Sequence, residues 1–254
     1  MAAGPSKGSA TDASSPSARF REAVLRLSAA QKPGDGVPAY TRWVNRRAAR
    51  WFAAGAYAIG WQPNTVTIVS ATLSFAGIGM LVALPPHPLL GLVVAALLAL
   101  GYVLDSADGQ VARLYGQSSR AGEWLDHVVD AVRSPAIHVG VAVATLRAWP
   151  DLDWFICVAL VYCIVNSAQF LSQILAEALV KGSGGQPNRG GTRRSLILLP
   201  TDPGVLCWSF VLWGFGDPFR VMYLLLAVIA VAHSAISMRR RYRDLLLLDR
   251  SGRA

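Results

Sequence analysis

Six long apolar segments follow one another along the chain, and polar residues cluster between them. Each segment has roughly 20 residues, which is enough for a helix to cross a hydrocarbon core about 30 Å thick. The pattern predicts an all-α integral membrane protein, a six-transmembrane-helix bundle. The predicted spans are residues 65–84, 89–111, 124–146, 154–175, 196–215 and 220–238.

Composition supports the same class of protein. The 254 residues are 53% hydrophobic and only 15% charged, and the mean hydropathy is +0.39. An ordinary soluble domain of this length carries more charge and is less apolar. We therefore expect membrane lipids to surround most of the chain.

Basic residues flank alternate ends of the predicted spans, whereas the connections at 85–88, 149–153 and 214–218 nearly lack Lys and Arg. By the positive-inside rule, this asymmetry predicts a multi-pass cell-membrane protein with both termini in the cytoplasm. The net charge is +9, and the basic residues lie at the ends of the predicted spans. This position favours contact with anionic headgroups over binding of nucleic acid. The basic groups are Arg46, Arg47 and Arg50; Arg113 and Arg120; Lys181, Arg189, Arg193 and Arg194; and Arg239, Arg240, Arg241 and Arg243.

Four regions are predicted along the chain. Residues 1–18 are rich in Ser, Ala, Gly and Pro and are expected to form a disordered tail. Residues 19–60 form a cytoplasmic or interfacial segment, in which 40–59 mix Arg with aromatic residues at near-helical spacing. That mixture is typical of an interfacial amphipathic helix, although a helix packed on the bundle fits equally well. The six-span catalytic domain is 61–240, and 241–254 form a basic cytoplasmic tail.

Carboxylates interrupt the second and third spans. At about 100° per residue, Asp105, Asp108, Gly109 and Ala112 share one face of a helix. In the third span Gly122, Asp126 and Asp130 recur at every fourth residue. Because a short turn joins these spans, they must be antiparallel neighbours, and the four carboxylates converge on the cytoplasmic side.

Four buried carboxylates would repel one another unless cations lie between them. Oxygen ligands without His or Cys favour Mg²⁺ or Mn²⁺, and a pair of such ions is typical of phosphoryl transfer. Arg113, which follows the acidic face, carries the charge that a bound phosphate requires. Carboxylates solvated at helix ends, or paired with Arg113, Arg120 and Arg133, are the structural alternative.

The spacing D-x2-D-G-x2-A-R-x8-G-x3-D-x3-D resembles the signature of the CDP-alcohol phosphotransferases, integral membrane enzymes of phospholipid synthesis. The resemblance implies that Asp105, Asp108, Asp126 and Asp130 hold two metal ions and that Asp130 is also the catalytic base. It implies that the donor, a CDP-alcohol, is bound by Gly109, Ala112, Arg113, Ser119, Asn64 and Thr67.

The reaction so implied is attack of a hydroxyl acceptor on the phosphorus distal to cytidine, with release of CMP. CDP-diacylglycerol is the expected lipid donor, and glycerol phosphate or inositol phosphate is the expected acceptor. Arg193 and Arg194 resemble an arginine-bearing motif of inositol-phosphate synthases, and Arg133 lies one turn beyond Asp130. These three arginines are therefore predicted to bind the acceptor, although topology-setting charge explains Arg193 and Arg194 as well.

Other features leave alternatives open. The run GEWLDHVVD resembles choline and ethanolamine phosphotransferases, in which a headgroup passes to a lipid alcohol, and His127 would then lie beside the metals. A cation-coupled transporter is a rival function, but the chain shows no inverted repeat. A homodimer is one further open possibility. A polar stripe in the fourth span lines an acceptor pocket or bonds neighbouring helices: Asn166, Gln169, Gln173 and Glu177.

Overall fold

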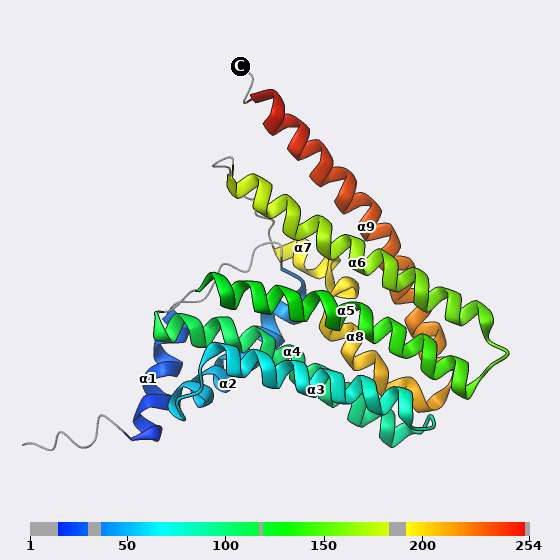
Figure 1. Cartoon of the computed structure of the whole chain (residues 1–254), viewed down its shortest axis with the longest axis horizontal. Helices are drawn as coiled ribbons and strands as arrows, with labels where there is room; N and C mark the ends of the chain where they lie inside the picture. The colour runs from blue at the N-terminus through cyan, green and yellow to red at the C-terminus, as the bar shows by residue number, and fades with distance from the viewer. Residues whose placement is uncertain (1–14, 30–36, 117–118, 183–191, 252–254) are drawn as a thin grey trace, which may run out of the picture.

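The computed structural model describes residues 15–29, 37–116, 119–182 and 192–251, and within these ranges the chain is helical and contains no strand (Figure 1). Five of the helices are long and apolar enough to cross a membrane. The prediction of an all-α, multi-pass membrane protein is therefore confirmed. The five helices are α3 (Pro63–Ala83), α4 (Pro88–Tyr115), α5 (Arg120–Ala148), α6 (Asp153–Gly182) and α9 (Asp217–Ser251).

The predicted fifth span, 196–215, is not one continuous helix, and in this respect the prediction was wrong. Pro200 and Pro203 interrupt it, because proline donates no backbone hydrogen bond and disfavours helical geometry in the residue before it. Asp202 is accordingly extended, with φ −75° and ψ 127°. The segment consists of α7 (Thr192–Ile197), the 3₁₀ turn η3 (Leu199–Thr201), α8 (Pro203–Ser209) and the 3₁₀ helix η4 (Phe210–Phe215).

Helices extend into both of the predicted tails. The helix α1 (Pro16–Ala29) begins inside the segment predicted to be disordered, and residues 1–14 lie outside the described part. At the other end, α9 continues to Ser251 through most of the predicted tail. The reason is local: no Gly or Pro follows Pro218 until Gly252, so nothing in the sequence stops the helix.

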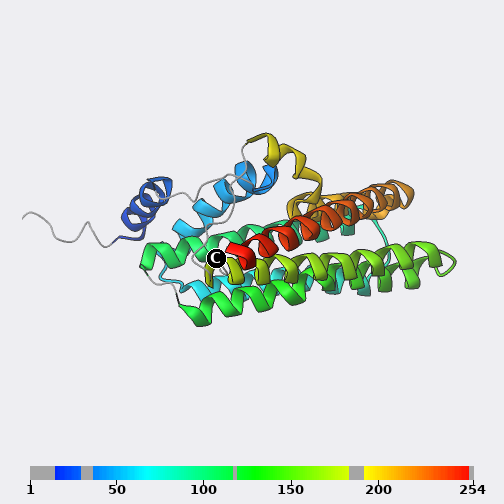
Figure 2. The same cartoon turned by 90° about the horizontal axis from the view of Figure 1, so that it is seen from above.

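The N-terminal segment packs on the bundle. A π-helical turn, η2 (Thr41–Asn45), leads into α2 (Arg46–Ala58), and α2 contacts α4 (Figure 2). Its alanines face inward: Ala49, Ala53 and Ala54 are fully buried, whereas Trp51 and Phe52 are exposed. The interpretation of this segment as a helix packed on the bundle is thus confirmed.

Close packing of α3 against α4 fixes the position of the site. A Cβ added to Gly101 would lie 2.2 Å from Ser74 Oγ and 3.1 Å from the carbonyl oxygen of Ser70, so glycine allows the two helices to approach at this point. Ser70 Oγ also donates a hydrogen bond of 2.8 Å to the Gly101 carbonyl. This contact lies one helical turn before the carboxylates of α4.

Candidate functional site

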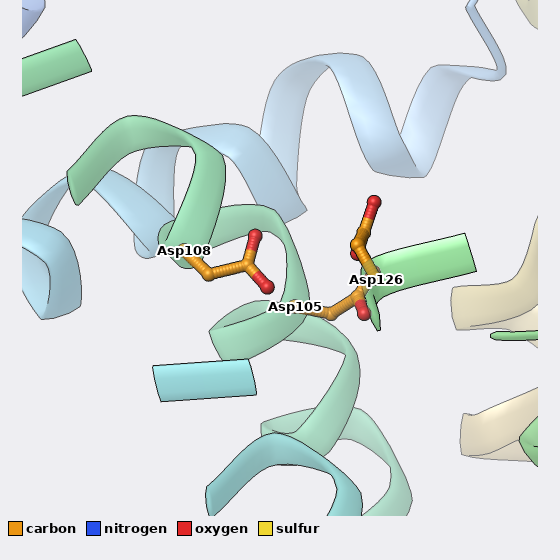
Figure 3. Close-up of side chains that lie close together, drawn as sticks. All are labelled: Asp105, Asp108 and Asp126. Carbon is orange, nitrogen blue, oxygen red and sulfur yellow. The ribbon is translucent and has the colours of Figure 1, made fainter. Parts of the chain in front are cut away.

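Three carboxylates from two helices converge near one end of the bundle. Asp105 and Asp108 project from α4, and Asp126 projects from α5 (Figure 3). One carboxylate oxygen from each lies within 4.8 Å of the other two. The second and third spans were predicted to be direct neighbours, but in the described part of the structure α3 packs closely against both α4 and α5, and α4 and α5 do not pack closely against each other. Their side chains nevertheless bring together three of the four predicted metal ligands.

The connection between α4 and α5 is shaped by two local signals. Gly116 ends α4 in the left-handed region, with φ 63°, a conformation that glycine adopts without strain. Ser119 then caps α5: its Oγ accepts a hydrogen bond of 3.0 Å from the Gly122 backbone nitrogen. These signals keep the connection short, so Asp126 on α5 returns to the level of Asp105 and Asp108.

Asp108 is buried, with 7% of its surface exposed. Thr67 Oγ1, from the first turns of α3, donates a 2.6 Å hydrogen bond to its Oδ2. Thr67 is itself buried, so this hydroxyl fixes the orientation of the carboxylate. The predicted donor-binding residue Thr67 thus contacts a predicted metal ligand directly.

Asp130, the predicted catalytic base, lies outside the three-carboxylate group and forms an ion pair with Arg133 one turn further along α5. The Arg133 guanidinium also donates 2.6 Å from Nη2 to Asp105 Oδ1 and 3.0 Å from Nη1 to Ser70 Oγ. It is buried. Arg133 was predicted to bind the acceptor, and the structure places it between the carboxylates of α4 and α5.

The donor set suits a hard divalent cation. In the described part of the structure, the basic groups in ion-pair contact with the four carboxylates are the Arg133 guanidinium and the His127 ring. The Nδ1 atom of His127 lies 3.5 Å from Asp126 Oδ2. Negative charge is therefore in excess. Carboxylate oxygens without thiolate partners match Mg²⁺ or Mn²⁺, and Asp105, Asp108 and Asp126 are the residues that could hold such an ion.

The small residues predicted to lie under the nucleotide border open space. A Cβ added to Gly109 would meet only Arg113 Nη1, at 3.9 Å, and Gly109 and Arg113 are both exposed. Ala112 lies on the same face of α4. The exposed side chain of Arg113 therefore borders the same space as Gly109.

The remaining predicted donor contacts meet at the α4–α5 turn. A Cβ added to Gly122 would lie 2.9 Å from Ser119 Oγ and 3.3 Å from Asn64 Oδ1. Asn64 lies at the start of α3, and Ser119 caps the start of α5. Gly122 therefore lies close to the first residues of both helices, which are more than 50 residues apart in the sequence.

The two other arginines predicted to bind the acceptor, Arg193 and Arg194, belong to α7, and their side chains lie outside the described part of the structure. Their neighbour Ser195 is fully buried. Ser195 Oγ accepts a hydrogen bond of 3.3 Å from Arg42 Nη1, on η2. The segment after α6 thus contacts the N-terminal segment, a pairing that the sequence did not reveal.

The polar stripe of α6 bonds neighbouring helices. Asn166 Nδ2 lies 2.7 Å from Ser134 Oγ and 3.1 Å from the ring of His138, both on α5. Gln169 Nε2 reaches Ser237 Oγ of α9 at 3.5 Å. Further along the stripe, Gln173 donates to Glu177 and accepts from Arg241 of α9. Of the two interpretations of the stripe, helix pairing is the one that these contacts support.

The sequence missed two contributors to this region. Ser70 of α3 accepts a hydrogen bond from Arg133 and Arg42 of η2 donates one to Ser195 of α7, and neither residue belongs to a recognisable motif. Pairing of the carboxylates with Arg133, by contrast, was the structural alternative read from the sequence, and the Arg133–Asp130 ion pair is of that kind, since residues three apart share a helical face. Arg42 reaches Ser195 across 153 positions, and no sequence spacing signals such a contact.

Comparison with known proteins agrees with this geometry. A family model described as CDP-alcohol phosphatidyltransferase matches residues 61–236. Phosphatidylinositol phosphate synthase of Mycobacterium marinum is 32% identical over 195 residues, which are 76% of this chain and 79% of that protein. A CDP-diacylglycerol–serine O-phosphatidyltransferase of Mycobacterium leprae is 26% identical over 144 residues, 57% of this chain and 44% of the relative.

Solved structures of a relative share the fold. The crystal structure of Mycobacterium tuberculosis phosphatidylinositol phosphate synthase with CDP-diacylglycerol bound aligns with a TM-score of 0.52 and 25% identity, covering 79% of this chain and 92% of that one. The same synthase in complex with manganese and citrate aligns with a TM-score of 0.50 and 25% identity, covering 75% and 87%. With the family model spanning most of the membrane domain and three motif carboxylates converging, the chain belongs to the CDP-alcohol phosphatidyltransferase family.

Proposed function

We propose that this protein transfers a phosphatidyl group from CDP-diacylglycerol to the hydroxyl of a phosphorylated alcohol, with inositol phosphate as the first candidate acceptor. The observation that carries the proposal is the convergence of Asp105, Asp108 and Asp126 from α4 and α5. The relative whose structure contains CDP-diacylglycerol, and the synthases of phosphatidylinositol phosphate among the relatives, support the donor and the acceptor respectively.

Asp105, Asp108 and Asp126 would hold Mg²⁺ or Mn²⁺, with Asp130 beside a second ion. When bound, these cations supply positive charge that stabilises the pyrophosphate and the CMP leaving group. Arg113, which borders the same open space as Gly109, binds the donor phosphate. The side chains of Asn64, Thr67 and Ser119 and the small residue Ala112 complete the donor site.

The chemical step is a displacement at phosphorus. The acceptor oxygen forms a bond to the phosphorus that carries the lipid, and the bond from that phosphorus to the CMP oxygen breaks. Asp130 accepts the hydroxyl proton, and CMP departs with the bonding electrons. Asp130 shares the Arg133 guanidinium with Asp105, so it lies next to the three-carboxylate group, which supports a role for it as base.

The same proposal includes the membrane topology. We infer that α8 and η4 make a sixth crossing of the plasma membrane. Their 13-residue apolar run, Pro203–Phe215, spans only about 20 Å, and α7 with η3 would extend it. An even number of crossings leaves both termini on one side of the membrane, and the basic residues at the span ends favour the cytoplasm for that side and for the site. The helix α2 would then lie at the interface, where its exposed Trp51 and Phe52 would contact lipid headgroups. Association of two copies stays an untested prediction.

The test is release of CMP. Purified protein with Mn²⁺ or Mg²⁺ and labelled CDP-diacylglycerol is expected to release CMP when inositol phosphate is added, and less or none with serine or with water alone. The panel includes glycerol phosphate, and CDP-choline with diacylglycerol, which tests the resemblance in GEWLDHVVD. No release with any acceptor would refute the proposed activity.

The arginines of α7 are tested separately. Arg194→Ala, and Arg193→Ala beside it, are expected to raise the KM for a phosphorylated acceptor without changing the KM for the donor. An unchanged acceptor KM in both variants would leave these residues as topology-setting charges.

A further inference from the structure

The helix α1 lies outside the part of the chain that the family model matches. That model covers residues 61–236, whereas α1 consists of Pro16–Ala29. In the described part of the structure, α1 packs against α2 and also contacts α4 (Figure 1). Membership of the family therefore does not account for α1 or for what it does beside α4.

The spacing of residues in α1 decides which of its side chains meet other helices. Ala23 and Leu27, four residues apart, are buried. At about 100° per residue, Arg19 and Arg26 lie within about 20° of each other and border that buried face, whereas Arg21 lies about 160° from Arg19. Arg21 is accordingly exposed. Two of the three arginines of α1 are thus placed to contact neighbouring helices.

Arg26 caps the end of α4. Its Nη2 donates a hydrogen bond of 2.9 Å to the carbonyl oxygen of Leu114, a buried residue in the last turn of α4. Carbonyl groups in the last turn have no partner within their own helix, and positive charge is favourable at this end of the helix dipole. Arg26 therefore supplies, from 88 positions away in the sequence, a partner that α4 itself does not provide.

Arg19 supports the same end of α4 through two tyrosines. Its Nη2 donates a hydrogen bond of 2.7 Å to the carbonyl oxygen of Tyr57, near the end of α2. Its guanidinium also lies over the Tyr57 ring, 5.1 Å from the ring centroid. The Tyr57 ring in turn packs against the ring of Tyr115, the last residue of α4, with the centroids 4.9 Å apart. Two separate routes thus connect α1 to the final two residues of α4.

Those two residues lie between parts of the proposed donor site. Arg113 directly precedes Leu114 in α4. Gly116 directly follows Tyr115 and ends the helix in the left-handed region, and Ser119 then caps α5. A displacement of the end of α4 would therefore move Arg113 and the turn that leads to Ser119.

We propose that Arg26 and Arg19 are positioning residues for the donor: α1 holds the end of α4 so that Arg113 and the α4–α5 turn keep the geometry that binds the diphosphate of a CDP-alcohol. This inference rests on the proposed function. The two guanidinium groups donate to carbonyl groups of the protein and act on the donor through α4. Their loss should weaken binding of the donor and leave binding of the acceptor unchanged.

The experiment compares Arg26→Gln, Arg19→Gln and Arg21→Gln in the full-length protein, in detergent micelles with Mn²⁺. Arg21 is the matched control, because it belongs to the same helix, carries the same charge, and donates at 3.4 Å to the Ser17 carbonyl within α1. The measurements are the Kd for CDP-diacylglycerol, the KM for this donor and for inositol phosphate, kcat, and thermal unfolding.

The expected change is confined to the donor. One hydrogen bond alters an equilibrium constant by about two- to tenfold, and we expect Arg26→Gln to raise the donor Kd and KM by such a factor. Arg19→Gln should have a smaller effect, since it acts through Tyr57. In both variants kcat at saturating donor and the KM for inositol phosphate should stay unchanged, and Arg21→Gln should match the wild type.

A conservative variant separates positioning from general stabilisation. Arg26→Lys keeps the charge and can still donate to the carbonyl, so it should recover part of the donor affinity. Three results would overturn the inference: an unchanged donor Kd in Arg26→Gln, an equal rise in Arg21→Gln, or a lower unfolding temperature in Arg26→Gln with both KM values unchanged.

Direct measurement of binding also separates this inference from the proposed function. If the wild type binds CDP-diacylglycerol but transfers no phosphatidyl group, the proposed transfer fails while the Kd values still test the role of α1. If the wild type releases CMP with inositol phosphate and all the variants bind the donor equally, the proposed function stands and the inference fails.

Discussion

Arg133 on α5 donates a 2.6 Å hydrogen bond to Asp105 on α4, and this bond links the two helices that carry the carboxylates. The same guanidinium pairs with Asp130 and contacts Ser70 of α3. One buried cation thus connects three helices at the site. This arrangement indicates that Arg133 positions the carboxylates. Experiments can separate this positioning role from the predicted role in binding the acceptor.

Arg133→Ala is expected to destabilise the protein. Removing one partner of a buried ion pair typically costs about 3–5 kcal/mol, because the remaining charge is left buried without compensation. Added Mn²⁺ should restore part of the loss by replacing the positive charge. Thermal unfolding in detergent, with and without Mn²⁺, measures both effects, and Arg120→Ala at the exposed start of α5 is the control. Normal stability with a selectively raised acceptor KM would instead identify Arg133 as an acceptor ligand.

Asp105→Asn and Asp130→Asn are expected to differ. Asp105 belongs to the three-carboxylate group, so its replacement should abolish both turnover and metal-dependent binding of CDP-diacylglycerol. Asp130→Asn should abolish turnover while the donor still binds, because it removes the proton acceptor. Binding titrations with and without Mn²⁺, alongside CMP release, separate the two. Equal loss of binding in both variants would argue against a distinct role for Asp130 as base.

Thr67→Val is expected to weaken metal-dependent binding of the donor. The substitution preserves the shape of the side chain and removes the 2.6 Å hydrogen bond to Asp108. The loss of a hydrogen bond to a charged group corresponds to about tenfold or more in affinity. Thr67→Ser, which keeps the hydroxyl, should remain close to the wild type. Both the Mn²⁺ concentration for half-maximal activity and the donor KM should rise in the valine variant alone.

Gly214→Ala is expected to disrupt the packing of η4 against the start of α4. A Cβ there would lie 2.1 Å from the carbonyl carbon of His87 and the nitrogen of Pro88, and backbone atoms cannot move aside as a flexible side chain can. Gly79→Ala is the matched control, since a Cβ at Gly79 meets nothing within 4 Å and alanine favours a helix interior by about 1 kcal/mol. Thermal unfolding of the purified variants should show a loss for Gly214→Ala only, and equal stability would contradict the packing described here.

Local pattern was sufficient for much of the molecule. Five of the six predicted spans are helices, because about 20 apolar residues in succession have few other ways to satisfy their backbone in a membrane. The carboxylate faces of α4 and α5 also followed from sequence alone, since helical periodicity and a short turn dictate which residues meet. The error at 196–215 had a visible signal in Pro200 and Pro203, which hydropathy outweighed.

The sequence by itself determined the membrane class, the carboxylate motif and its preference for a hard cation, because these depend on composition and on spacing within single helices. Only the tertiary structure decided which side chains form hydrogen bonds between elements. It joined Arg133 to Asp105, Thr67 to Asp108, and Arg42 to Ser195. These pairs are 28, 41 and 153 positions apart. Their contact follows from how the helices pack, which depends on close approaches such as the one at Gly101. Periodicity along a single helix does not encode such packing.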